Sequence, residues 1–166
     1  MRTAVIILLC VTAGGCSWLK LPRLPQRVLK PAAVVTQVRQ VERSEIAARY
    51  EIDVSLYNPN DFPLPITFAA YSLSIGGSSY KTDTVPSATL PATGRLTVSL
   101  PAVLRTGAEA GSDAPGFDAS GTFTITPEGE MRRMLYEIGF PKPRAVFNGR
   151  GEVGATIGGG SAQPGK

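Results

Sequence analysis

The chain has 166 residues and a formal net charge of +4, and 43% of its residues are hydrophobic. This composition is typical of a folded domain rather than of a hydrophilic disordered chain, and the mild positive charge gives no reason to expect nucleic-acid binding. The chain has no histidine, which removes Ser–His and Cys–His nucleophiles and the commonest metal ligand. Its 13 carboxylates form no pair marked for acid–base work, so we expect no enzyme, no metal and no cofactor.

Residues 1–15 have the pattern of a secretory signal, with a charged start, an apolar run and small residues before Cys16. Residues 12–16, TAGGC, resemble a bacterial lipobox, in which cleavage before the cysteine accompanies acylation of its sulfur. We therefore expect a palmitate-type lipoprotein anchored to a membrane through Cys16. Ala13 stands where such signals usually have leucine, so an uncleaved anchor or ordinary secretion stays open. Ser17 resembles the residue that follows the cysteine in outer-membrane cargo, which indicates the periplasmic side of the outer membrane.

Residues 16–32 are expected to form a tether between the lipid and the folded domain. The segment contains four cations and three prolines and no acid: Lys20, Arg23, Arg27, Lys30, Pro22, Pro25 and Pro31. The prolines disfavour a helix and favour an extended spacer. The cations are either solvated or lie against anionic lipid. Both cysteines fall within the first sixteen residues, so the folded part would have no disulfide.

The stretch over residues 46–75 organises the folded part. Apolar side chains occupy every second position from Ile46 to Leu56, which predicts a half-buried strand. The opposite face carries outward charges and a possible surface patch: Glu51, Asp53, Ser55 and Tyr57. The tripeptide Asn58-Pro59-Asn60 then has turn chemistry at each position.

A second strand follows this turn. Its inward positions begin with Ile66 and Phe68 and change phase before Tyr71, as a β-bulge near residues 69–70 would produce. The alternating strand, the NPN turn with the following FPLPI, and YSLSIGG together resemble the WHy domain of group 2 late-embryogenesis-abundant (LEA14-like) proteins. The resemblance covers roughly residues 33–153 and is most specific over residues 54–77. It makes Asn58, Pro59 and Asn60 a family motif, although their spacing alone is explained by a turn.

The other strands are marked by alternation and by glycine or proline. We expect a first strand over residues 34–41, a hairpin at Gly76-Gly77, a strand over residues 95–100 that ends or lies at an edge at Pro101, and strands over residues 117–125 and 143–153. Residues 106–116 are expected to form a loop. A G-x-G-x-x-G pattern at Gly149, Gly151 and Gly154 lacks the helix that a dinucleotide site requires.

One helix is expected between the last two strands. Thr126 can cap it, Pro127 suits its first position, and Gly139 and Pro141 stop it. Apolar residues recur at helical spacing: Met131, Met134, Leu135 and Ile138. We expect this stripe to face the core over one open end of the sandwich; the alternative is a partner-binding face.

The sequence therefore predicts an all-β protein, an antiparallel β-sandwich of Ig or fibronectin type with about seven strands and one short helix. The expected organisation is a signal peptide (residues 1–15), a tether (16–32), the LEA2/WHy-like domain (33–154) and a flexible tail (155–166). The resemblance implies non-enzymatic protection of proteins or membranes under desiccation, osmotic or cold stress. We expect a monomer that contacts the membrane through Cys16 and meets client or partner proteins. The alternative is an envelope adaptor that binds a partner through an exposed strand edge.

Overall fold

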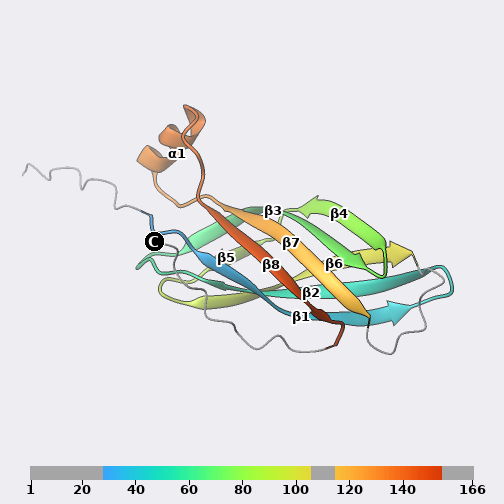
Figure 1. The fold of residues 1–166 in the computed structure, drawn as a ribbon. Coiled ribbons are helices and arrows are strands. Elements are labelled where there is room, and N and C mark those ends of the chain that lie inside the picture. The colour runs from blue at the N-terminus through green and yellow to red at the C-terminus, as the bar shows by residue number, and fades with distance from the viewer. Residues whose placement is uncertain (1–27, 106–114, 155–166) are drawn as a thin grey trace, which may run out of the picture.

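Two antiparallel sheets pack face to face in the computed structural model, which describes residues 28–105 and 115–154 (Figure 1). The elements are β1 (Ala32–Arg43), β2 (Ala47–Tyr57), β3 (Leu64–Ile75), β4 (Ser78–Thr84), β5 (Ala88–Leu90), β6 (Arg95–Arg105), β7 (Gly116–Ile125), α1 (Glu130–Glu137) and β8 (Arg144–Glu152). Seven of these strands have seven residues or more, and β5 has three. The predicted all-β sandwich with one short helix is confirmed.

The first sheet, sheet A, has the order β1-β2-β6, and the second, sheet B, has the order β4-β3-β7-β8 with β5 paired to β3. The two sheets approach each other along the edges formed by β1 and β8. There the Gly154 amide donates to the Val38 carbonyl at 2.7 Å. A Cβ on Gly149 would lie 2.6 Å from the Cβ of Val35, so this contact requires glycine. The glycines of the G-x-G-x-x-G pattern therefore lie on or directly after β8, where Gly149 allows the sheets to meet.

The core consists of the inward side chains of both sheets, in the phase that alternation predicts. From Ala48 to Leu56, every second residue of β2 is buried, and Ile52 is fully buried. On the opposite sheet Phe123 and Phe147 pack with ring centroids 5.2 Å apart. Each buried side chain of this size contributes roughly 1.5–3 kcal/mol relative to exposure, so the core alone can hold a domain that has no disulfide.

Two predicted inward positions are wrong. Ile46 is 80% exposed, because the chain turns between Ser44 and Ala47, with the Ser44 amide donating to the Ala47 carbonyl at 2.7 Å, and β2 starts only at Ala47. Phe68 is exposed and Ala69 is buried, since the bulge lies between Ile66 and Phe68 rather than at residues 69–70. Only the pairing with β7 fixes which residue is the extra one.

The hairpin and the edge strand agree with prediction. Gly76 and Gly77 have φ values of 53° and 79°, the region that a two-residue hairpin requires and glycine adopts without strain. Strand β6 does lie at the edge of sheet A, and it continues through Pro101 to Arg105. The Pro101 carbonyl accepts a hydrogen bond from the hydroxyl of Tyr71 in the facing sheet.

Helix α1 differs from its prediction in both its start and its packing. The N-cap is Gly129, because Thr126 stays with the strands: its amide donates to the Pro65 carbonyl at 3.1 Å. The end is as predicted, with Gly139 at a φ of 99°. Figure 1 shows α1 standing off the end of the sandwich where β1 begins. Met134 is 61% exposed and Ile138 is 69% exposed, so the expected packing of this stripe into the core is wrong.

Candidate functional site

The turn Asn58-Pro59-Asn60 is a buried, hydrogen-bonded polar cluster rather than a surface turn, and it is called the NPN lock below. Asn58 and Asn60 are the buried polar residues of the described part of the chain. The Asn58 amide group donates to the carbonyls of Phe62 at 2.8 Å and Pro91 at 2.9 Å, and its side-chain oxygen accepts from both nitrogens of Asn60. Every side-chain polar atom of the pair therefore has a partner, the condition under which such groups are stable inside a protein.

Asn60 extends this lock to the start of β1. Its side-chain oxygen accepts from the Leu29 amide at 2.7 Å, and its side-chain nitrogen donates to the Leu29 carbonyl at 3.0 Å. The Asn60 carbonyl also accepts from the Thr93 amide at 2.8 Å. Three segments distant in sequence are thus joined at one turn: the chain before β1, the β2–β3 turn and the β5–β6 loop. Residue spacing indicated the turn but not these long-range partners.

The four residues of the predicted surface patch share the outer face of sheet A. Glu51 accepts from Arg39 at 2.6 Å and lies 3.5 Å from a guanidinium nitrogen of Arg49. Asp53 accepts from the Ser99 hydroxyl and lies 4.0 Å from Arg39. The Glu51 hydrogen bond, followed by the charges of Asp53 and Glu51, raises the pKa of the Arg39 guanidinium. The carboxylates are therefore already paired within their own sheet.

The other two patch residues complete a cross-strand row on this face. Ser55 lies between Val34 of β1 and Thr97 of β6. Tyr57 lies opposite Arg95, whose guanidinium carbon is 5.4 Å from the centroid of the tyrosine ring. This face carries hydroxyl side chains and paired charges, with the exposed apolar Val103 opposite Arg49. It is suited to weak contacts through hydrogen bonds and not to holding a small molecule or a metal.

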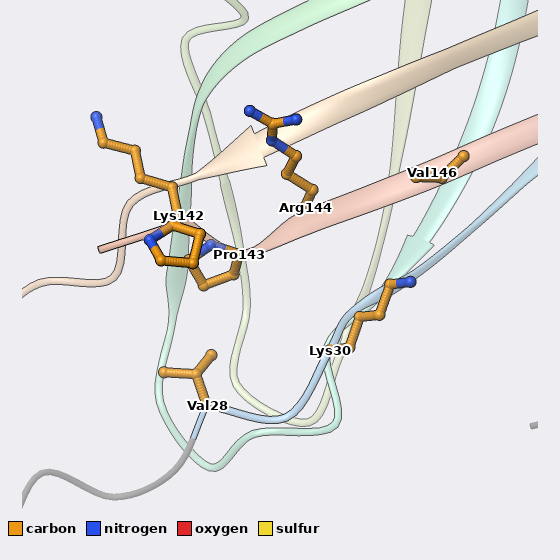
Figure 2. Close-up of a pocket in the computed structure, with 7 residues that line it drawn as sticks. Val28, Lys30, Lys142, Pro143, Arg144 and Val146 are labelled. Atoms are coloured by element: carbon orange, nitrogen blue, oxygen red, sulfur yellow. The ribbon is translucent and has the colours of Figure 1, made fainter. Parts of the chain in front are cut away.

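Helix α1 is fixed to the sandwich on one side only. Arg132 lies over the ring of Phe62, with 4.5 Å between the guanidinium carbon and the ring centroid. Leu135 and Tyr136 are half-buried, and burial raises the pKa of the Tyr136 hydroxyl against the opposing charge of Arg132. Beside the chain that leaves α1 lies an open hollow of about 490 Å³ (Figure 2). Its lining is Val28, Lys30, Pro141, Lys142, Pro143, Arg144 and Val146.

Residues 28–105 and 115–154 contain neither a metal-binding cluster nor a membrane-spanning helix. Within these ranges no three residues of the types His, Cys, Asp and Glu lie close enough together to hold a metal ion. No helix in the same ranges is both long enough and apolar enough to span a bilayer. Cys16, the predicted acylation site, and the expected signal peptide and tail lie outside the described residues.

Comparisons with known proteins support the fold. No family model matches the sequence, and no curated protein matches it. The solution structure of AT1g01470 from Arabidopsis thaliana matches with a TM-score of 0.57 and 18% identity, covering 76% of this chain and 83% of that one. The solution structure of At2g46140.1, a putative late embryogenesis abundant protein, matches with a TM-score of 0.52 and 16% identity, covering 82% and 75%. At these identities the likeness shows the fold alone: this chain shares its β-sandwich with a putative late embryogenesis abundant protein.

Proposed function

We propose that this protein is a lipid-anchored, non-enzymatic LEA2/WHy-type protein that protects other proteins or membranes during desiccation, osmotic stress or cold. The observation that carries the proposal is the β-sandwich shared with a putative late embryogenesis abundant protein. The sequence resemblance supports it independently, because it is most specific over residues 54–77, which contain the NPN lock. The lipobox-like TAGGC adds an acylated Cys16 in the cell envelope, on the periplasmic side of the outer membrane.

The outer face of sheet A is the surface that we assign to protection. A protective surface has to contact many unrelated clients weakly, and it must not bind any one of them strongly. Paired charges such as Arg39–Glu51 meet this requirement, because their attraction for a further charge is partly satisfied already. Short hydroxyl side chains beside them offer hydrogen bonds that replace lost water at low energetic cost.

Protection is tested by drying or freezing an unrelated enzyme with the protein and measuring the activity that survives. An inert protein of equal size and charge at the same mass concentration is the reference, because any crowding agent gives some benefit. We expect more surviving activity with this protein, and less of that advantage with the double variant Glu51→Gln, Asp53→Asn. The matched control is Asp118→Asn, Glu152→Gln, which removes two carboxylates from sheet B and changes the net charge by the same amount. A folded protein with no advantage over the inert reference would contradict protection.

The adaptor function requires a partner strand to pair with an open edge. On β6 that edge is interrupted near its middle, because Pro101 has no N–H and its carbonyl is already bonded to Tyr71. This favours protection over strand addition at β6. Cross-linking of the membrane-bound protein in envelopes separates the two functions: one stoichiometric partner supports the adaptor, and a diffuse set of clients supports protection.

The lipid anchor has its own test. Cells that express the wild-type chain or the Cys16→Ala variant are labelled with a fatty-acid analogue. We expect label on the wild-type protein alone. Label that persists on the variant would contradict acylation at Cys16.

A further inference from the structure

The exposed apolar side chains at the α1 end of the sandwich have no partner that the fold explains. Met134 and Ile138 are four residues apart and so lie on one face of the helix, and Phe140, directly after it, is 57% exposed. The opposite side of α1 is the one held by Arg132 on Phe62. The helix is thus fixed by its polar and half-buried side, while its apolar side projects outward, opposite to the usual arrangement on a protein surface.

The hollow beside α1 provides unpaired positive charge. Lys30, Lys142 and Arg144 line it together with apolar walls, and no acid is among the lining residues (Figure 2). In the described part of the chain none of these three cations forms an ion pair with a carboxylate. Their charged ends point in different directions around the hollow (Figure 2), so they form a positive rim without counter-charges, which attracts an anionic surface.

The helix itself adds apolar contact rather than net charge. Its two acids, Glu130 and Glu137, balance Arg132 and Arg133, and Glu137 lies 3.5 Å from Arg133. Attraction to an anionic surface therefore comes from the hollow, and burial of apolar area comes from α1 and Phe140. Cations beside projecting apolar side chains are the combination with which peripheral proteins contact the interface of an anionic bilayer.

The position of Val28, which lines the hollow, places the attachment of the tether at this end; this step rests on the proposed lipid anchor. Cys16 lies twelve residues before Val28, so the intervening chain reaches at most about 40 Å. Strand β1 starts beside the hollow and has 12 residues, which carry the other end of the sandwich about 40 Å away. The Asn60 hydrogen bonds to Leu29 fix where the tether joins the domain. A lipid on Cys16 therefore holds the α1 end nearest to the anchor, but a tether about as long as the sandwich does not fix the orientation by itself, so contacts at the α1 end have to fix it.

We propose that the α1 end, defined as residues 28–30, α1 and residues 140–146, is a docking surface for an anionic lipid bilayer. Lipid phosphates lie against the rim of the hollow, at Lys30, Lys142 and Arg144. Met134, Ile138 and Phe140 enter the interface beside them. The domain then stands on the membrane in one orientation, with the outer face of sheet A free to meet client proteins.

The test uses the full-length mature protein on vesicles whose acyl chains carry a nitroxide quencher. A fluorophore is attached at Ile138→Cys and, as the matched control, at Ile46→Cys, which is at least as exposed but lies at the opposite end. The parent protein treated with the same label serves as the blank. We expect quenching at position 138 and not at position 46 when phosphatidylglycerol is present, and weaker quenching in phosphatidylcholine alone. Removing cations through Lys142→Gln and Arg144→Gln should lower the docked-to-undocked ratio about fivefold each, whereas Lys81→Gln on β4 should leave it unchanged.

Equal quenching at both positions, or none at position 138, would overturn the docking surface. So would a signal at position 138 that changes only when envelope proteins are added, since it would assign this end to a protein partner. Failure of the anchor has a different result. If the chain lacks acylation but position 138 is still quenched on anionic vesicles, the docking surface is supported and the lipid anchor is contradicted. If the chain co-floats with vesicles through Cys16 while position 138 stays unquenched, the lipid anchor is supported and the docking surface is contradicted.

Discussion

The NPN turn and helix α1 lie at the same end of the sandwich, and their burial is the reverse of their polarity. The two asparagines are buried, whereas Met134 and Ile138 are exposed. The difference arises from the groups that the fold places around the turn and around the helix. Backbone groups of residues 29, 62 and 91 surround the turn and satisfy its amides, but the packing of α1 through Arg132 and Phe62 leaves the apolar side of the helix uncovered. For these two elements, burial therefore follows from the partners that the fold supplies and not from side-chain hydrophobicity.

The largest expected effect comes from removing the centre of the lock. Asn58→Ala should lower the free energy of unfolding by about 2–4 kcal/mol, because the buried nitrogens of Asn60 lose the Asn58 side-chain oxygen and the part-buried carbonyls of Phe62 and Pro91 lose their donor. This cost would approach the about 2–5 kcal/mol expected for Ile52→Ala in the core. Urea titrations measure both, with exposed Asn148→Ala as the control. A loss no greater than that of the control would mean that water replaces the Asn58 amide.

Tyr71 extends the comparison to a second buried polar group. Burial, with the neighbouring Tyr80, raises the pKa of its hydroxyl to about 12. The unfolded chain ionises this group near pH 10 and the folded protein near pH 12, so its contribution to stability is complete below pH 10 and is lost as the pH rises to about 12. The loss should be on the order of 2 kcal/mol.

The measurement is a series of urea titrations between about pH 9 and 12 on the wild-type protein and Tyr71→Phe. The wild type should be the more stable at the lower pH, since its hydroxyl donates to the Pro101 carbonyl. Its advantage should shrink and then reverse as the pH rises, because phenylalanine has no proton to lose. Stability curves that stay parallel over this range would contradict the raised pKa of Tyr71.

The strands could be predicted from the sequence because alternation reports a local property. A residue two positions along a strand faces the same side, so the buried face of β2 was visible without any knowledge of its partners. The bulge was displaced by two residues, since the phase change between Ile66 and Tyr71 shows that a residue is extra and only β7 decides which one. The outer-face position of Glu51 and Asp53 was predicted in the same way, but not the arginine and serine that bind them.

The hydrogen bonds of the NPN lock and the exposed apolar side of α1 could not be predicted, and the reason is the same for both. Asn60 bonds to Leu29, 31 residues away, and Asn58 bonds to Pro91, 33 residues away, and neither partner leaves a signal in residues 58–60. Helical spacing shows which side of α1 is apolar, but it does not show whether a sheet covers that side. The three cations of the hollow come from two segments more than a hundred residues apart, residue 30 and residues 142–144, which meet only in the fold.

The smallest expected effect lies on the exposed side of α1. Met134→Ser and Ile138→Ser together should change the free energy of unfolding by no more than about 0.5 kcal/mol, because these side chains leave little water when the protein folds. Urea titrations without lipid test this, and Ile52→Ser should be far more damaging in the same assay. The double variant should nevertheless bind anionic vesicles less well if α1 contacts the bilayer, so that stability and docking separate at the same two residues. A loss of stability like that of a core substitution would show that α1 packs against the sandwich in solution, and the contrast with the NPN turn would then disappear.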